Sequence, residues 1–159
     1  MITMSSALQR ELRQRRPFRS PAHEATVGLM RTADLIRRQA AALIEPHGIT
    51  LQQFNVLRIL RGAGDEGLPT LEVAERMIEQ TPGVTRLLDR LEAKELVRRQ
   101  RCPKDRRQHL CWITNKGLSL LERLDIVTDN AHEEALKGLR QKDRVTFIRL
   151  LDGIRAAHQ

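Results

Sequence analysis

Apolar residues recur at helical spacing in the middle of the chain. Val84, Leu87, Leu88 and Leu91 are spaced i, i+3, i+4, i+7, a pattern that predicts a helix with one buried stripe. We expect Thr81 to cap this helix and Pro82 to take its first position, where a missing N–H costs nothing. The opposite face is polar and basic and holds Pro82, Thr85, Arg86, Asp89 and Arg90.

Three more helical patterns precede this one. The first covers 22–45 and ends at a Pro-His-Gly turn. The second starts at Thr50, which forms a capping box with Gln53, and it is apolar on more than one side, as a central buried helix would be. The third is short and starts at Thr70, a candidate cap, with Leu71 among the residues expected to face inward.

Two strands follow the polar-faced helix. Segments 96–102 and 108–113 predict a β-hairpin with 103–107 as its tip. Thr114 is a good cap for a long helix over about 116–136, and a last amphipathic helix covers about 141–157. The fold class is therefore mainly α with a small hairpin.

The outer helices lie outside the compact unit 50–114, and their apolar faces need a cover. We expect a symmetric dimer in which these helices pack against their copies, because a large exposed apolar patch usually marks an interface. The alternative is that they fold back on the central unit. The expected domains are a basic arm at 1–20, a dimerisation helix at 21–48, a central lobe at 49–115 and C-terminal dimerisation helices at 116–159.

The net charge of +8 is concentrated in two segments. Residues 76–107 hold ten Lys or Arg and five Asp or Glu, and residues 1–20 hold five Arg and one Glu. Such a balance favours polyanionic partners, and an outward basic helix beside a basic hairpin favours duplex DNA. The arm at 1–20 is either a disordered tail or a mobile segment with a helical turn or two around 7–12.

Composition argues against several other classes. Cys102 and Cys111 lack metal-ligand or redox spacing, so we expect no metal, no cofactor and a reducing cytoplasm. No carboxylate pair, triad or phosphate loop indicates an enzyme. The sequence has neither an apolar run of membrane-spanning length nor an apolar leader, so we expect no membrane partner.

Several segments taken together resemble the MarR (multiple antibiotic resistance) family of bacterial regulators. They are GITLQQFNVLRIL, VTRLLDRLEAKELVRRQRCPKDRRQHLCWITNKG and LSLLERL. The resemblance covers about residues 25–155 and departs from the family at Glu95-Leu96, where a Gly is usual. It implies a homodimeric winged helix-turn-helix with long terminal dimerisation helices, which binds an inverted repeat and acts as a ligand-responsive repressor.

The resemblance also assigns roles along the basic face. The helix at 81–95 would lie in the major groove, with Thr85 and Arg86 as readers of bases or phosphates and Pro82 on the same face. Thr81 and Arg90 would contact backbone phosphates, although Arg90 could instead pair with Asp89 or Glu92. Arg98, Arg99 and Lys104 would contact phosphates. The family pattern suggests that Asp105 braces an arginine entering the minor groove, either Arg107 or its competitor Arg106.

A small aromatic or anionic effector is implied by the same resemblance, and its pocket is expected in the region around His47, Phe54 and the helix at 25–45. Two other functions remain open on the sequence. One is a non-specific, architectural DNA-binding protein, which would bind any duplex with strong salt dependence. The other is a winged-helix module whose basic face binds a protein partner.

Overall fold

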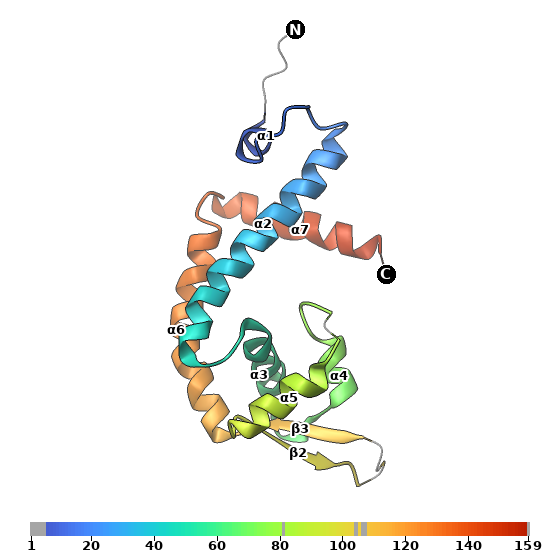
Figure 1. Cartoon of the computed structure of the whole chain (residues 1–159), viewed down its shortest axis with the longest axis vertical. Helices are drawn as coiled ribbons and strands as arrows, with labels where there is room; N and C mark the ends of the chain where they lie inside the picture. The colour runs from blue at the N-terminus through green and yellow to red at the C-terminus, as the bar shows by residue number, and fades with distance from the viewer. Residues whose placement is uncertain (1–5, 81, 104, 106–107, 159) are drawn as a thin grey trace. The chain divides into compact units, whose positions relative to one another are not determined.

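The computed structural model describes residues 6–80, 82–103, 105 and 108–158 (Figure 1). The chain divides into two compact units, residues 1–39 and residues 40–159. The first unit contains α1 (Ala7–Glu11) and most of α2 (Pro21–Ile44), whose last residues enter the second unit. The helical turn expected near 7–12 is present as α1. In the second unit the elements are, in order, η1 (Glu45–His47), α3 (Leu51–Ala63), η2 (Gly64–Glu66), β1 (Leu68–Pro69), α4 (Thr70–Glu75), α5 (Val84–Ala93), β2 (Val97–Arg101), β3 (His109–Ile113), α6 (Asn115–Ala135) and α7 (Gln141–Ala156).

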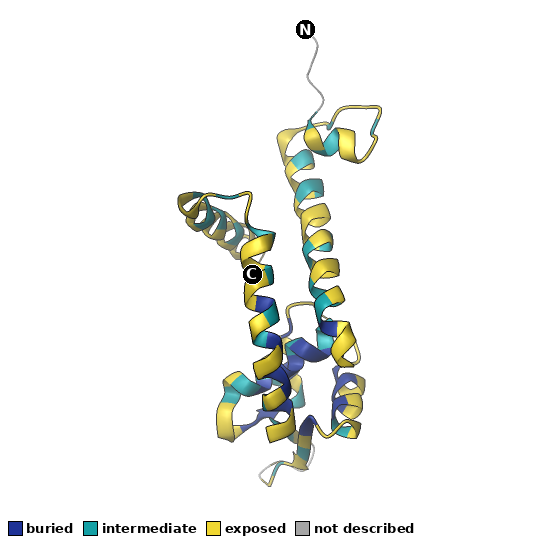
Figure 2. Ribbon diagram, turned by 90° about the vertical axis from the view of Figure 1, so that its left-hand side faces the viewer, coloured by how far each residue is buried: buried dark blue, intermediate teal, exposed yellow. Residues whose placement is uncertain are grey.

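Helix α3 lies at the centre of the second unit, as its all-round apolar pattern predicts. The capping box at its start is complete: Thr50 Oγ1 accepts from the backbone N of Gln53 at 3.2 Å, and Gln53 Oε1 accepts from the N of Thr50 at 3.0 Å. Ile49 and Phe54 are both buried in the core, where a hydrophobic staple would place them. Figure 2 shows that the buried residues gather around α3, α5 and the first half of α6.

The sheet has three antiparallel strands in the order β1-β3-β2, one more than the predicted hairpin. Strands β2 and β3 pair from Val97 opposite Ile113 to Arg101 opposite His109. The added strand, β1, is only two residues long and pairs Leu68 with Cys111. A segment this short is below the length at which an alternating pattern can be recognised, which is why it was not predicted.

Two predicted helix starts are wrong. Helix α5 begins at Val84, not at Pro82, because Gly83 adopts a left-handed backbone with φ of 104° and so precedes the first helical residue. Helix α4 has Pro69 at its cap position, and Thr70 is its first helical residue. With that phase the side chain of Leu71 is 72% exposed, not inward, while Val73 is fully buried.

Glu95-Leu96, where the family usually has a glycine, lie in the turn between α5 and β2. Glu95 has a φ of 61°, a left-handed conformation that glycine adopts more readily than other residues. Gly117, at the start of α6, lies close against this turn. A Cβ at that position would stand 2.4 Å from the carbonyl oxygen of Leu96 and 2.7 Å from Cγ1 of Ile113. Helix α6 therefore fixes the base of the hairpin through a close backbone approach.

Candidate nucleic-acid interface

Helix α5 is divided sharply between a buried and an exposed face. Its four apolar stripe residues are buried in the core, at 8% exposure or less. Thr85, Arg86 and Arg90 are exposed, and Pro82 is exposed in the turn before the helix. Within the described part of the chain, neither Arg86 nor Arg90 has an ion-pair partner, so the alternative considered for Arg90, an ion pair with Asp89 or Glu92, is absent, and both carboxylates pair with Arg99 instead. Thr81 lies outside the described residues.

Arg99 of strand β2 binds two carboxylates on the outward-facing side of α5. Its Nε donates to Glu92 Oε2 at 2.9 Å, one terminal nitrogen donates to the same oxygen at 2.6 Å, and the backbone N of Arg99 donates to Glu92 Oε1 at 3.2 Å. The terminal nitrogen also lies 2.6 Å from Asp89 Oδ1. The Arg99 side chain is only 19% exposed. Two carboxylates therefore neutralise this guanidinium, which makes it a brace and not a free phosphate ligand.

The burial and the hydrogen bonds of Arg99 also shift the pKa of its guanidinium. Burial works to lower the pKa of the guanidinium, but the hydrogen bonds to Glu92 and Asp89 raise it above its ordinary value. The cation is thus held charged in the folded protein. In the sequence, Asp89 and Glu92 were considered only as alternative partners of Arg90, whereas both contact Arg99 in the structure. Their spacing, i and i+3 on one helical face, is the sequence signal that could have pointed to a shared partner on the next strand.

Arg98 and Trp112 anchor the outer side of the hairpin to the body. They face each other across β2 and β3, and the Arg98 guanidinium carbon lies 4.1 Å from the centroid of the Trp112 ring. The Trp112 indole N–H donates to the carbonyl oxygen of Asp65 at 3.0 Å. A Cβ on Gly67 would stand 2.5 Å from the indole ring, so the ring is tightly seated. Trp112 therefore fixes the hairpin to the body of the second unit.

The hairpin tip is described only in part. The Cys102 N–H donates to the Gln108 carbonyl at 2.9 Å, and the Gln108 N–H donates to the Asp105 carbonyl at 2.9 Å, which closes the tip. Asp105 is exposed. Lys104, Arg106 and Arg107 lie outside the described residues, and with them lies the proposed contact between Asp105 and an arginine.

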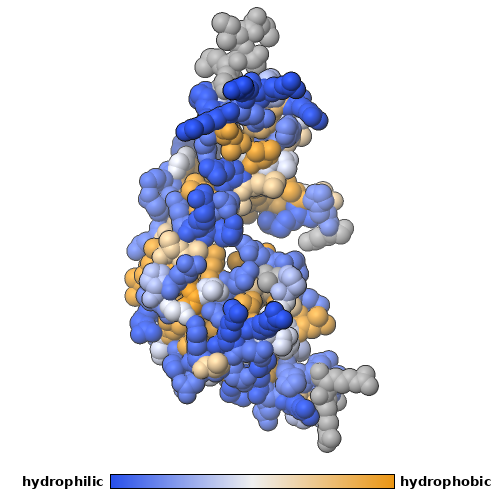
Figure 3. Space-filling view, in the orientation of Figure 1, coloured by the Kyte–Doolittle hydropathy of each residue, from blue (hydrophilic) through white to orange (hydrophobic). Residues whose placement is uncertain are grey.

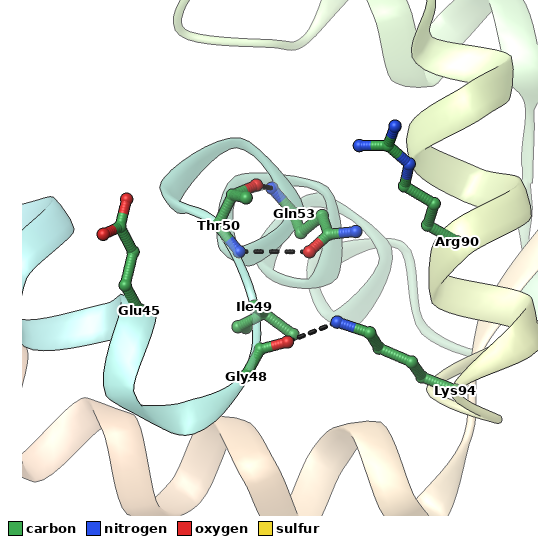
Figure 4. Close-up of a pocket in the computed structure, with 7 residues that line it drawn as sticks. All are labelled: Glu45, Gly48, Ile49, Thr50, Gln53, Arg90 and Lys94. Atoms are coloured by element: carbon green, nitrogen blue, oxygen red, sulfur yellow. Dashed lines mark hydrogen bonds between the residues drawn. The ribbon is translucent and has the colours of Figure 1, made fainter.

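A pocket of about 260 Å³ lies where the segment before α3 meets α5 (Figure 4). Arg90 and Lys94 reach toward it from α5, and Lys94 Nζ donates to the carbonyl oxygen of Gly48. The full lining is Glu45, Gly48, Ile49, Thr50, Gln53, Arg90 and Lys94. Neither residue of the predicted effector pocket lines it: His47 is exposed, and Phe54 is buried in the core with Arg58 over its ring. The effector site expected around His47 and Phe54 therefore stays a prediction.

The cysteines have separate environments. Cys111 is fully buried, and burial raises the pKa of its thiol, with Thr70 Oγ1 at 3.6 Å from the sulfur. Cys102 is half-buried. In residues 6–158, apart from the undescribed positions, no group of three His, Cys, Asp or Glu side chains could hold a metal ion. Among the helices of the described residues, none combines the length and the apolar character needed to cross a membrane.

An amphipathic helix that packs on α3 and α4 and is followed by a braced hairpin is typical of the winged helix-turn-helix class. The family model of the MarR family matches residues 49–109. A solved MarR transcription factor from Planctomyces limnophilus is 36% identical, with a TM-score of 0.67, and the match covers 85% of this chain and 98% of that one. The chain belongs to the MarR family, whose members are transcription regulators.

Two further relatives place the match in context. The transcriptional regulator MhqR of Bacillus subtilis is 37% identical over 90 residues, and these span 57% of this chain and 59% of MhqR. BpsR of Bordetella bronchiseptica is 25% identical with a TM-score of 0.73, and the match covers 86% of this chain and 94% of that one. The DNA binding of BpsR is regulated by 6-hydroxynicotinic acid.

Proposed function

We propose that this protein is a homodimeric, sequence-specific DNA-binding regulator that represses transcription from an inverted repeat. The observation that carries the proposal is the outer face of α5. Two arginines there, Arg86 and Arg90, are exposed and have no partner among the described residues, while the opposite face is locked into the core. A rigid helix with unpaired cations matches the demand of a major groove lined by phosphates and guanine acceptors.

The residues take different roles in this proposal. Arg86, near the start of α5, reads a base edge, and Thr85 assists it. In this proposal Pro82, Thr81 and Arg90 contact backbone phosphates. The hairpin is the wing: Arg98 and Lys104 contact phosphate, and Arg107 or Arg106 enters the minor groove with Asp105 beside it. Arg99 is reassigned from phosphate contact to bracing, because Glu92 and Asp89 bind its Nε and one of its two terminal nitrogens.

Dimerisation is supported by apolar side chains that the second unit leaves exposed. Helix α7 buries no residue, although it is amphipathic. Four of its apolar side chains and Ile126 of α6 are between 49% and 71% exposed. The four side chains of α7 are those of Val145, Ile148, Leu150 and Ile154. A second copy of the chain covers such faces most economically, so we assign 21–48 and 116–159 to the dimerisation domain.

Regulation by a small effector belongs to the same proposal and is supported by the behaviour of BpsR. The pocket of Figure 4 touches both the segment before α3 and the recognition helix, so a ligand there would act on the position of α5 directly. Arg90 and Lys94 favour an anion at that place. We propose a cytoplasmic location and no catalytic role for the protein.

A footprinting experiment on DNA neighbouring the gene tests this proposal. We expect the protein to protect an inverted repeat with half-sites about one helical turn apart. Native mass spectrometry of the complex should give two protomers for each repeat. Arg86→Ala should abolish protection at concentrations where Arg123→Ala, a matched loss of an exposed arginine on α6, still protects. Uniform protection of any duplex, or protection unaffected by Arg86→Ala, would overturn the proposal.

A further inference from the structure

Residues 6–20, the described part of the N-terminal arm, contain a short helix and hydrogen-bonded turns. Ser6 Oγ caps α1 by accepting from the Gln9 N–H at 3.1 Å. Beyond the helix, the Gln14 N–H donates to the Gln9 carbonyl at 3.0 Å, and Gln9 Nε2 donates to the Gln14 carbonyl at 3.2 Å. Arg31 of α2 donates to Glu11 Oε1 at 2.9 Å. These hydrogen bonds hold the segment before α2 in one defined shape.

A second set of interactions shapes the entry into α2. Ser20 Oγ accepts from the His23 N–H at 3.1 Å, and the Ser20 carbonyl accepts from the Glu24 N–H at 3.1 Å. The Arg19 N–H donates to His23 Nδ1 at 3.3 Å, and the edge of the Phe18 ring packs on the His23 ring with centroids 5.2 Å apart. Because Nδ1 accepts, a neutral His23 carries its proton on Nε2, where it can donate to a ligand. Near the start of α2 the N–H groups of His23 and Glu24 are already bonded to Ser20, so the site argued below is made by side chains.

Between these two sets of interactions lies a cavity of about 630 Å³. It is an open hollow on the surface, because every residue that lines it except Gln14 is exposed. Arg16 and Arg19 line it, both are exposed, and neither has an ion-pair partner within residues 6–158 as far as the structure describes them. The other lining residues are Gln14, Pro17, Ser20 and His23, so no acidic side chain opposes the two cations. Figure 3 shows hydrophilic side chains over the segment that follows the grey N-terminal residues.

We propose that this cavity is a binding site for phosphate groups, separate from the recognition helix and the wing. Two guanidinium forks suit the paired oxygens of a phosphate, and the Ser20 hydroxyl and His23 Nε2–H add neutral donors. The phosphate belongs either to DNA backbone that flanks the repeat or to a small phosphorylated molecule. The flanking-DNA source rests on the proposed function, whereas the small-molecule source does not.

The test uses the full-length protein, the double variant Arg16→Ala/Arg19→Ala and a matched control, Arg37→Ala/Arg38→Ala. Both control arginines already pair with Asp34 on α2, and their removal subtracts the same total charge. In the first arm, affinity is measured for the protected repeat alone and for the repeat with longer flanks, at several salt concentrations. In the second arm, inorganic pyrophosphate is titrated calorimetrically into each protein without DNA.

If flanking DNA supplies the phosphate, the double variant keeps the affinity of the bare repeat and loses the gain from the flanks. Its salt slope for the long duplex falls by about 0.9 for each phosphate that the variant no longer neutralises. If a small molecule supplies it, pyrophosphate binds the wild type and the control but not the double variant. The site is refuted if the double variant matches the control in both arms. If the wild type does not bind DNA, the proposed function is refuted, and the pyrophosphate titration alone then tests the phosphate site.

Discussion

Removal of the charged contacts of Arg99 should lower the free energy of unfolding, and the size of the loss depends on how far Arg99 and its two partners are buried. In Arg99→Met the aliphatic stem keeps its packing, but Glu92 loses its charged partner and Asp89 loses one hydrogen bond. The Arg99 side chain is 19% exposed, while Glu92 and Asp89 are 41% and 54% exposed, so the pair lies between a surface and a buried ion pair. Hydrogen bonds to charged groups contribute about 1.5–3 kcal/mol each when well shielded, and exposed pairs contribute about 0–1 kcal/mol. We therefore expect a loss of about 1–3 kcal/mol.

A double-mutant cycle of Arg99→Met with Glu92→Gln isolates the coupling free energy between the two side chains from the other effects of each substitution. The glutamine side chain keeps an oxygen that can accept from the Arg99 backbone N–H, so the cycle reports mainly on the charged interaction between the side chains. We expect a coupling free energy of about 1 kcal/mol. The assay is urea unfolding at fixed protomer concentration, followed by far-UV circular dichroism and by the fluorescence of the single tryptophan, which lies in the sheet. A coupling near zero, with Arg99→Met within about 0.5 kcal/mol of wild type, would refute the brace.

Three other perturbations test the packing and ionisation that stabilise the second unit. Gly117→Ala should lower the free energy of unfolding by about 1–3 kcal/mol or more in the same assay, because its Cβ would meet backbone atoms that cannot move freely. The control Gly138→Ala, whose Cβ would have no atom within 4 Å, should leave this free energy unchanged, and equal effects of the two variants would contradict the argument. Asp125 accepts from Arg61 at 2.5 Å and 3.2 Å, and this hydrogen bonding lowers the pKa of Asp125, so its stabilisation is present above the unfolded pKa and is lost as pH falls through the folded pKa. The stability advantage of wild type over Asp125→Asn should therefore shrink below about pH 4, and a constant difference from pH 7 downward would exclude the ion pair as its cause. Finally, a maleimide should label Cys102 well before Cys111 in the native protein, as read by mass spectrometry of the peptides, because Cys111 is fully buried with a raised pKa; faster labelling of Cys111 would show that the sheet opens.

The sequence predicted most elements of the second unit because their signals are local. The Thr50 capping box, the stripe from Val84 to Leu91 and the Thr114 cap each depend on residues within one or two turns, and each is present. The misplaced start of α5 has a similar local cause: a left-handed Gly83 outweighs the preference of Pro82 for a first helical position.

The interactions that sequence reasoning missed join residues distant along the chain. Strand β1 exists because Leu68 meets Cys111, 43 positions later, and no short window holds that information. The pocket of Figure 4 is likewise built from Glu45 and Lys94, which come together only when α5 packs beside the start of α3. Arg99 was identified as a cation, but its burial beside Glu92 depends on the packing of β2 against α5. Charge can be read from sequence, whereas the neutralisation of a charge requires the fold.

The affinity of the wild type and of Arg86→Ala for two duplexes at one salt concentration tests the central proposal most directly. The duplexes are the protected repeat and a scrambled sequence of the same composition. We expect the wild type to prefer the repeat by about 1,000-fold or more, and Arg86→Ala to lose about tenfold or more on the repeat with little change on the scrambled duplex. Equal binding of the two duplexes by the wild type, or an unchanged affinity of Arg86→Ala for the repeat, would contradict base reading by α5.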